Sequence, residues 1–469
     1  MLVPLYTYVL DSSAEYGIVT NLYAWTALLL VILTYGMETG YFRFANKNRD
    51  EADKVYSTTL IAVGFTSFLF AAACVLFSHP IAGAMGYTTH PEFISMLGVV
   101  VAMDAFGCIP FAYLRYKNRP IKFAALKLFM IFANILFNLF FLIGCPWLLK
   151  HAPSSVGWFY NPHYGVGYVF VANLISTALV TLALIPDMRV KLSFDYKLLR
   201  QMLVYSLPLL ALGIAGIMNQ TLDKILFPFL MPDKARAATD LGIYGATSKI
   251  AMVMLMFTQA FRYAYEPFIF AQHKDKNSLE AYADAMKFFI VLSLLIFLGM
   301  VLYLDVFKYI IQRNYWEGLK VVPIVLFSFI FQGIFFNLSL WYKLTDQTMY
   351  GAWFSALGTI LIVVINVIFV PIYSYTASAW AAFVCYFVIM MVSYYFGQKH
   401  MPIKYDLKTI GKYTLLTIVL YLLGAYINFH HTGINLLYRT VLLFSFLYYM
   451  TRHDFPLNKL PFINKFFRK

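Results

Sequence analysis

The sequence contains few charged residues. They make up 12% of its 469 residues, which is about half of the share that is usual in a soluble domain. Hydrophobic residues make up 61%, and the mean hydropathy is +0.70. Because such a chain cannot cover its surface with polar side chains, a soluble globular fold is excluded. The composition predicts an all-α polytopic membrane protein.

Other absences narrow the class of function. No polar stretch between the hydrophobic segments is long enough for a soluble domain, so any function must be built from the spans and their short connections. The connection at 149–164 offers Lys150, His151 and His163 but no carboxylate. It therefore contains no evident general acid/base pair, which argues against an enzyme. The four cysteines stand singly, without metal-ligand spacing, and we interpret them as packing residues.

Long hydrophobic runs are what the sequence does have. Stretches of about 20 apolar residues predict thirteen spans: Gly17–Phe42, Val55–Phe77, Phe93–Leu114, Phe123–Leu149, Gly165–Ile185, Leu203–Leu230, Gly242–Phe270, Phe288–Leu304, Val321–Tyr342, Tyr350–Tyr373, Ala377–Phe396, Tyr413–Phe429 and Ile434–Tyr449. The segment Met1–Leu10 is apolar but too short to span, and it lacks the features of a signal peptide. We interpret it as the end of a further first helix that begins upstream, which would make fourteen spans.

A weak internal repeat divides these spans. Tyr16-Gly17-Ile18 aligns with Leu241-Gly242-Ile243 at an offset of 225, and Arg115-Tyr116-Lys117 aligns with Trp341-Tyr342-Lys343 at 226. A nearly constant offset is typical of transporters built from two repeats. We expect two six-helix lobes related by a pseudo-two-fold axis, at 1–190 (spans 1–6) and 195–400 (spans 7–12), then a helix pair at 405–452 (spans 13–14) and a basic cytoplasmic tail at 453–469.

Lysine and arginine gather in alternate connections. Counted from the loop 43–54, alternate loops and the C-terminus hold 25 of the 36 basic residues, the opposite loops hold six and the spans five. Because basic residues accumulate on the cytoplasmic side, these loops are predicted to be cytoplasmic, as are both termini of a chain with the first span complete. The net charge of +14 then reflects topology and anionic lipid, and no nucleic-acid partner is expected.

Asp104 is a carboxylate near the middle of a predicted span. It lies eleven residues into Phe93–Leu114, and Pro110 is expected to bend that helix. A carboxylate at this depth is costly to keep ionised without a cation. Asp104 is therefore predicted either to couple transport to an ion or to pair with Lys127 in the next span. Arg115, at the cytoplasmic end, is either solvated or a phosphate ligand at a cavity mouth.

A helical hairpin from about Tyr205 to Gln272 carries polar groups on both of its otherwise apolar arms. On the first arm, Asn219 and Asp223 are about 40° apart around the helix, and Gln220 and Lys224 flank them. Such groups at bilayer depth normally face a wet cavity or a partner. We expect the substrate path here.

On the second arm, five polar residues are predicted to form one stripe: Ser248, Thr258, Gln259, Arg262 and Glu266. Arg262 is expected to matter most, because its planar guanidinium can hold two phosphate oxygens at once. The alternative for Arg262 is an ion pair with Glu266. Lys249 points away from the stripe, and either lines the cavity or extends to the membrane interface.

Several segments resemble the polysaccharide flippases of the multidrug/oligosaccharidyl-lipid/polysaccharide exporter superfamily. They are LVPLYTYVLDSSAEYGIVTNLYAWTALLLVILTYGMETGYFRF, IPFAYLRYKNRPIKFAALKL, and NQTLDKILF followed by LGIYGATSKIAMVMLMFTQAFRYAYEPFIF. The likeness covers nearly the whole chain. It implies two six-helix lobes around a cavity that opens alternately to either side, in the bacterial inner membrane.

The resemblance also implies the substrate and the partners. Such proteins move undecaprenyl-pyrophosphate-linked oligosaccharides from the cytoplasmic to the periplasmic leaflet, for O-antigen, capsule or exopolysaccharide assembly. The expected partners are that lipid-linked glycan, membrane lipids and a polysaccharide polymerase, with no cofactor beyond a coupling proton or sodium ion. Members with two extra C-terminal helices resemble the lipid II flippase, in which this pair shapes a groove for the lipid tail.

Residues and resemblance agree on one hypothesis. The headgroup is held in a wet cavity by Arg262, Lys224, Asn219 and Gln220, with Gln259, Lys249 and Arg115 as further contacts. The carboxylates Asp104, Asp223 and Glu266 are the candidates for ion coupling. The alternatives are a lipid II flippase, a cation-coupled multidrug exporter of the same superfamily and, with less support, a membrane glycan polymerase or ligase.

Overall fold

The computed structural model describes residues 2–47, 49–272, 278–345, 347–427, 429 and 431–454, and of 266–272, 278 and 432 only the backbone. Within these residues the chain forms helices and no strand. Twelve stretches of described helix are long and apolar enough to cross a membrane. The predicted class, an all-α polytopic membrane protein, is therefore confirmed.

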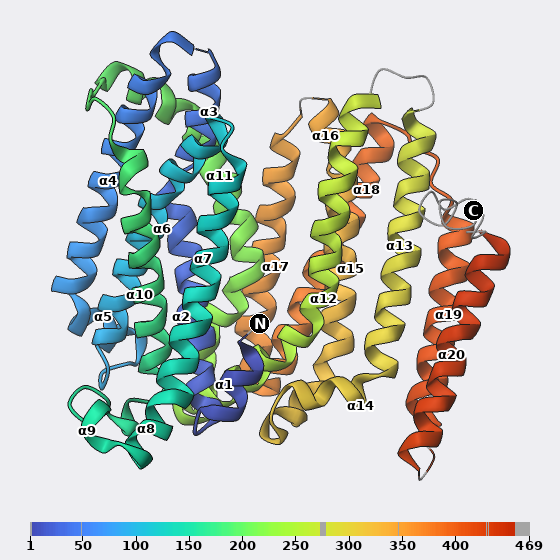
Figure 1. Ribbon diagram of the computed structural model, residues 1–469. Coiled ribbons are helices and arrows are strands. Elements are labelled where there is room, and N and C mark those ends of the chain that lie inside the picture. Colours follow the sequence, from blue (N-terminus) through green and yellow to red (C-terminus); the bar gives the residue numbers. More distant parts are fainter. Residues whose placement is uncertain are drawn as a thin grey trace, which may run out of the picture. The chain divides into compact units, whose positions relative to one another are not determined.

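The chain divides into two compact units, Met1–Gly242 and Ile243–Lys469. The division falls within one long helix, α12, whereas the internal repeat places the start of the second lobe near residue 195. Contacts therefore group α11 with the first unit, and the lobes stay a prediction that depends on the repeat. The helices up to the division are α1 Val3–Val9, α2 Ser13–Thr34, α3 Met37–Lys47, α4 Ala52–Leu76, α5 Ser78–Met85, α6 Glu92–Tyr116, α7 Pro120–Leu139, α8 Cys145–His151, α9 Pro153–Val156, α10 Gly167–Leu184, α11 Tyr196–Leu230 and α12 Lys234–Gln272 (Figure 1).

The second unit contains the rest of α12 and the remaining helices. These are α13 Ser278–Leu302, α14 Leu304–Phe307, α15 Val322–Leu338, α16 Leu340–Leu344, α17 Met349–Tyr373, α18 Tyr375–His400, α19 Leu407–Tyr426 and α20 Thr432–His453. In this unit α15 packs against α18, and α13 contacts both α19 and α20. The predicted tail at 453–469 lies almost entirely outside the described residues.

Each predicted span lies largely within helix, although several differ in detail. The span predicted at Gly17–Phe42 is continuous only to Thr34, because Tyr35 (φ 33°) and Gly36 (φ 70°) adopt left-handed conformations before α3 begins. Helix α11 begins before the predicted Leu203, because Asp195 Oδ1 accepts a hydrogen bond from the Leu198 amide at 3.0 Å and caps the helix there. Helix α20 forms as predicted but is not among the twelve stretches, since Arg439 and several tyrosines lower its mean hydropathy.

Two glycines that the internal repeat equates lie against each other in the first unit. A Cβ atom added to Gly17 would stand 1.9 Å from the Ala238 carbonyl oxygen, and one added to Gly242 would stand 1.8 Å from the Ser13 carbonyl oxygen. Helices α2 and α12 thus approach backbone to backbone at this crossing. Small residues that permit such contact are typical of packing between membrane helices.

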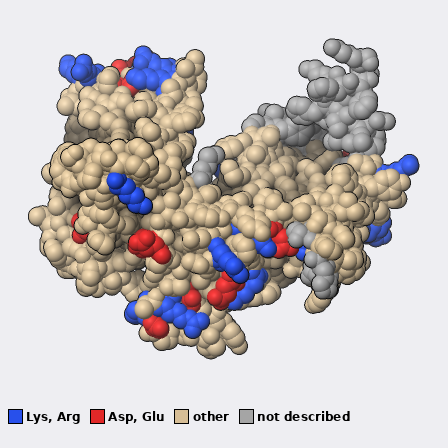
Figure 2. All heavy atoms as spheres, turned by 60° about the horizontal axis from the view of Figure 1, so that its bottom comes forward, with Lys and Arg blue, Asp and Glu red and all other residues tan. Residues whose placement is uncertain are grey.

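Charged residues gather at one end of the first unit. Lys54 pairs with Asp195 at 2.8 Å, Lys122 with Asp187 at 2.6 Å and Lys117 with Asp53 at 3.3 Å. The hydrogen bond from Lys54 lowers the pKa of Asp195 below its ordinary value. These lysines belong to loops that the count of basic residues predicts to be cytoplasmic. Figure 2 shows charged side chains in clusters separated by broad uncharged surface, as a lipid-facing exterior requires.

Candidate functional site

The first unit contains a cavity of about 430 Å³ among five of its helices, α2, α3, α6, α7 and α10. Four of these, α2, α6, α7 and α10, belong to stretches long enough to span a membrane. The volume is typical of a small-molecule site. The lining residues are Leu30, Val31, Thr34, Glu38, Met103, Asp104, Gly107, Cys108, Phe111, Arg115, Phe123, Lys127, Met130, Thr177, Val180, Thr181 and Leu184.

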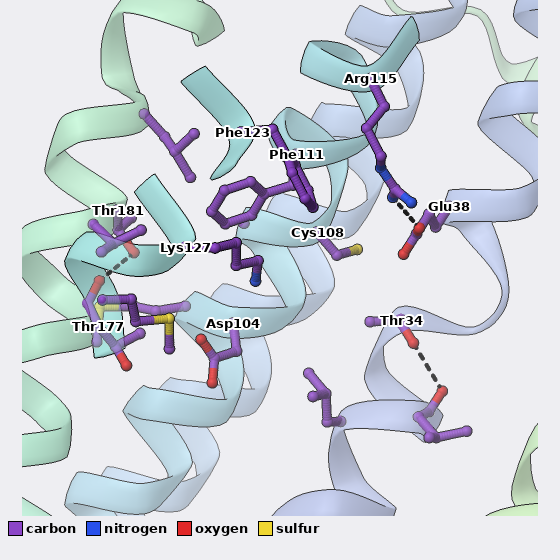
Figure 3. A pocket seen from close by; sticks show the side chains of 17 residues that line it. Thr34, Glu38, Asp104, Cys108, Phe111, Arg115, Phe123, Lys127, Thr177 and Thr181 are labelled. Carbon is purple, nitrogen blue, oxygen red and sulfur yellow. Dashed lines mark hydrogen bonds and ion pairs between the residues drawn. The ribbon is translucent and has the colours of Figure 1, made fainter. Parts of the chain in front are cut away.

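Asp104 lies in the middle of α6 and faces this cavity, as Figure 3 shows. Its carboxylate is directed toward the side of the cavity where Thr177 of α10 lies, and the side chain of Lys127 from α7 lies above it in the view. Lys127 lines the same cavity, but among the described residues no ion pair within 4 Å joins the two. The sequence indicated that Asp104 either couples transport to an ion or pairs with Lys127. In the structure these two opposite charges line one cavity without direct contact.

Lys127 is a site residue that sequence reasoning used only as a possible partner for Asp104. Its Nζ lies 4.1 Å from the centroid of the Phe111 ring, a cation–π contact. A lysine inside the span that follows Asp104 was the available signal. Whether it reaches the same cavity depends on the register between α6 and α7, which the sequence alone does not fix.

Arg115 lies at the edge of the cavity, where the sequence placed it. Its Nη2 donates to Glu38 Oε1, and its Cζ lies 5.1 Å from the Phe42 ring centroid and 5.4 Å from that of Phe123. The guanidinium is therefore held by a carboxylate and two aromatic rings. Arg115 and Glu38 together form a neutral pair at one side of the cavity.

A buried hydroxyl completes the polar lining. The Thr177 side chain is 2% exposed, and its Oγ1 has no hydrogen-bond partner among the described residues. Its carbonyl oxygen accepts from Thr181 Oγ1 at 2.9 Å. Buried hydroxyls are normally hydrogen-bonded, so the Thr177 hydroxyl is an unused donor beside Asp104 and Lys127.

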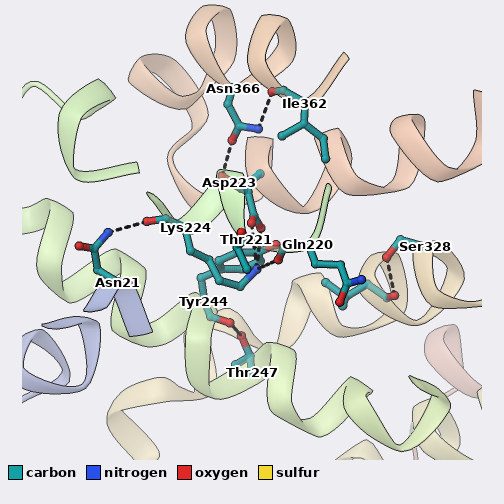
Figure 4. A network of polar contacts seen from close by, with 12 residues as sticks. Asn21, Gln220, Thr221, Asp223, Lys224, Tyr244, Thr247, Ser328, Ile362 and Asn366 are labelled. Carbon is teal, nitrogen blue, oxygen red and sulfur yellow. Dashed lines mark hydrogen bonds and ion pairs between the residues drawn. The ribbon is translucent and has the colours of Figure 1, made fainter. Parts of the chain in front are cut away.

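The polar sector predicted on α11 is organised differently (Figure 4). Asn219 and Asp223 are buried, as their shared face predicts, whereas Gln220 is exposed and Lys224 is partly buried. Lys224 Nζ pairs with its chain neighbour Asp223 at 2.8 Å and also donates to the Gln220 carbonyl oxygen at 3.2 Å. Asn21 of α2 donates to the Lys224 carbonyl oxygen at 2.8 Å. The structure thus brings the four residues together around an ion pair.

The residues predicted on α12 belong to the second unit. Ser248 and Thr258 are buried, Gln259 and Arg262 are partly buried, and Lys249 is exposed. Arg262 Cζ lies 5.5 Å from the Phe336 ring centroid, and the side chain of Glu266 lies outside the described residues. Of the residues predicted for the site, Asp104 and Arg115 line the cavity of the first unit. The roles of the residues on α11 and α12 stay predictions.

Comparison with known proteins identifies the family. Residues 1–273, more than half of the chain, match the profile of a family described as "Polysaccharide biosynthesis protein". The chain belongs to this family. The resemblance to polysaccharide flippases is confirmed at the level of family, and no curated protein matches this family member in sequence.

Solved structures share the fold of this polysaccharide biosynthesis family member. The lipid II flippase MurJ, in an inward closed conformation, matches with a TM-score of 0.69 at 14% identity over 96% of this chain and 99% of that chain. An inward-facing multidrug resistance MATE family transporter of the MOP superfamily matches with a TM-score of 0.65 at 14% identity over 88% and 94%. An outward-facing conformation of such a MATE family transporter matches with a TM-score of 0.57 at 13% identity over 88% and 92%. At these identities the likeness shows the fold.

Proposed function

We propose that this chain is a flippase that moves undecaprenyl-pyrophosphate-linked oligosaccharide repeat units across the bacterial inner membrane by alternating access. The direction is from the cytoplasmic to the periplasmic leaflet, for surface polysaccharide biosynthesis. The family description and a fold shared with flippases and transporters support this proposal. The loops that contain Lys54 and Lys117 face the cytoplasm, since basic residues accumulate on that side of the membrane.

One observation carries the proposal. Asp104 and Lys127 are ionisable groups on membrane-length helices, and they face a cavity rather than each other at contact distance. Charged groups at membrane depth are costly and mark transport paths. A hydrated cavity with charges of both signs suits a headgroup of sugars and phosphates better than it suits an apolar drug.

Residues outside this cavity are also proposed to act on the substrate. Arg262 is the principal phosphate ligand on α12, and Lys224, Asn219, Gln220, Gln259, Lys249 and Arg115 supply polar contacts to the headgroup. Asp104 is the foremost ion-coupling carboxylate, with Asp223 and Glu266 as further candidates for a proton or sodium ion. The polyprenyl tail stays in lipid throughout, because transferring it into a polar cavity would forfeit its burial in hydrocarbon.

A transport assay with purified protein tests the proposal. The full chain is reconstituted into liposomes that contain a fluorescent polyprenyl-pyrophosphate-linked disaccharide, and an impermeant glycosidase reports how fast inner-leaflet substrate becomes accessible. Protein-dependent acceleration is expected, and Arg262→Ala is expected to abolish it while reconstitution stays normal. If wild-type protein leaves the rate at that of empty liposomes, this substrate class is wrong.

A second candidate is a lipid II flippase. It is favoured by the match to MurJ, which covers 96% of this chain and so includes most of the C-terminal helix pair α19 and α20. The same liposomes loaded with lipid II compare the two substrates directly. Export of a lipophilic cation such as ethidium, with neither lipid transported, would instead indicate a multidrug exporter.

A further inference from the structure

Two of the charged side chains that line the cavity of the first unit are not held in an ion pair by any described residue. Glu38 and Arg115 are hydrogen-bonded to each other, so they contribute no net charge to the cavity. Asp104 and Lys127 remain, and no described residue forms an ion pair with either of them within 4 Å. Lys127 instead rests on the face of the Phe111 ring. An ammonium ion at membrane depth has much to gain from an anionic partner.

A neutral donor lies beside these charges. The hydroxyl of Thr177 is buried, lines the cavity and lacks a hydrogen-bond partner among the described residues. An unpaired buried hydroxyl costs free energy that a bound acceptor would recover. In Figure 3 the side chain of Lys127 lies above that of Asp104 and the side chain of Thr177 lies to one side of it, and all three line the same cavity.

We propose that this cavity is a phosphate subsite of the flippase, separate from Arg262, in which Lys127 binds a phosphoryl oxygen of the substrate and Asp104 competes with that oxygen for Lys127. This inference rests on the proposed function and places a phosphate of the substrate headgroup in this cavity. Thr177 donates a second hydrogen bond to the same phosphoryl group. Because Arg115 is already hydrogen-bonded to Glu38, Lys127 is the cation of the described lining that no described carboxylate contacts within 4 Å.

Competition between Asp104 and phosphate couples binding to protons. A phosphate on Lys127 brings negative charge close to Asp104, and like charges in a medium of low dielectric constant disfavour the ionised carboxylate. Asp104 therefore takes up a proton when the substrate binds. The other titratable groups that face Asp104 are Tyr23 on α2, Cys108 on α6 and the Glu38–Arg115 pair at the mouth. None of these supplies a cation that could replace Lys127.

The sign of the pH dependence follows from this linkage. Because binding consumes a proton, affinity rises as pH falls, for as long as Asp104 is ionised in the free protein. The lipid-linked substrate is suited to this test, because both of its phosphates are esterified and neither titrates near neutral pH. Asp104→Asn removes the competitor, so that variant should bind more tightly at high pH and show little pH dependence.

Binding to purified full-length protein in nanodiscs of zwitterionic lipid tests the proposal. The probe is the polyprenyl-pyrophosphate-linked disaccharide, titrated between about pH 5.5 and 8.5, a range that brackets the neutral region in which only perturbed carboxylates titrate. Lys127→Met, which keeps the side-chain length, is expected to weaken binding about tenfold or more, the value of one charge-assisted hydrogen bond. Lys127→Arg should retain most of the affinity, and Thr177→Val should lose a smaller part. Lys197→Met, an exposed lysine of α11, is the matched control and should bind as wild type.

The outcomes separate this inference from the proposed function. Unchanged affinity and pH dependence in Lys127→Met, with normal binding by wild type, would overturn the subsite and leave the flippase proposal standing. A wild type that binds inorganic pyrophosphate through Lys127 but not the lipid-linked disaccharide would refute the substrate. Equal competition by phosphatidylglycerol would assign the subsite to ambient anionic lipid and would also overturn the proposal.

Discussion

Helix α2 borders two regions of the first unit that differ in how closely they are packed. Its first half is locked in place: Gly17 touches the backbone of α12, and Asn21 donates to the carbonyl oxygen of Lys224. Its second half, from Leu30 to Thr34, borders a cavity. Helix α2 is therefore held against its neighbouring helices in its first half and lines the cavity in its second half.

The charged pairs of the two regions differ in the same way. Asp223 and Lys224, beside the locked half, are adjacent in sequence and in direct contact at 2.8 Å. Asp104 and Lys127, beside the open half, come from different helices and are kept apart. Direct contact between opposite charges stabilises the fold, whereas charges held apart around a cavity stay available to a ligand. Depth in a span is thus a poor guide to function until the partner of each charge is known.

The largest effect is expected from a bulky side chain at the close contact between α2 and α12. In Gly242→Val the added Cβ would overlap the Ser13 carbonyl oxygen, and backbone cannot move aside as a side chain can. We expect a loss of more than about 3 kcal/mol of stability and little folded protein in fluorescence-detected gel filtration. Gly216→Ala on α11, where an added Cβ meets nothing within 4 Å, is the control and should be neutral or slightly stabilising. A normal yield of folded Gly242→Val would show that the close packing of α2 against α12 is not needed for stability.

The paired charges beside the locked half should matter for stability. Asp223 is nearly fully buried, so Lys224→Met leaves a buried carboxylate without its contact and should cost about 3 kcal/mol. The double variant Asp223→Asn, Lys224→Met should recover much of this loss, because no uncompensated charge remains. Thermal unfolding in detergent, followed by tryptophan fluorescence, measures both. Equal stability of the single and double variants would show that the pair is not the relevant unit.

The separated charges beside the open half should matter for transport instead. Lys127→Met is expected to lower the transport rate of the lipid-linked disaccharide about tenfold with an unfolding temperature close to that of wild type, because no ion pair is broken. The assay is the liposome measurement described above, with Lys197→Met in parallel. A large drop in unfolding temperature without a transport defect would place Lys127 with the stabilising charges.

The smallest effect concerns a half-exposed carboxylate of the second unit, Asp305, which is paired with the buried Arg439. Burial alone would raise the pKa of Asp305, but hydrogen bonds from Arg439 and Lys308 hold it below the ordinary value. The pair therefore adds stability above the ordinary pKa of about 4, and this is lost as pH falls through the lower folded value. The difference in unfolding temperature between wild type and Asp305→Asn should be constant above about pH 5 and shrink below about pH 4. A difference that persists at about pH 3 would contradict this account.

The sequence predicted the spans more reliably than the site. Each predicted span lies largely within helix, and Asp104 and Arg115 lie at the middle and the end of α6. Two features were not predicted from the sequence. One is a local backbone conformation, and the other depends on how two helices pack together. The left-handed residues Tyr35 and Gly36 interrupt a run that is apolar enough to continue. The place of Lys127 in the cavity depends on how α7 lies against α6.

The amino-acid sequence by itself determined that this chain lives in a membrane, where its spans lie and which family it belongs to. The first two follow from local composition, because a backbone in lipid must form its hydrogen bonds within each span and present apolar side chains to hydrocarbon, whereas the family was indicated by the resemblance of particular segments. Only the tertiary structure decided which charges meet and which stay apart. Lys224 pairs with its neighbour while Lys127 faces a cavity, because the position of a side chain between helices is set by their register and packing rather than by its own depth.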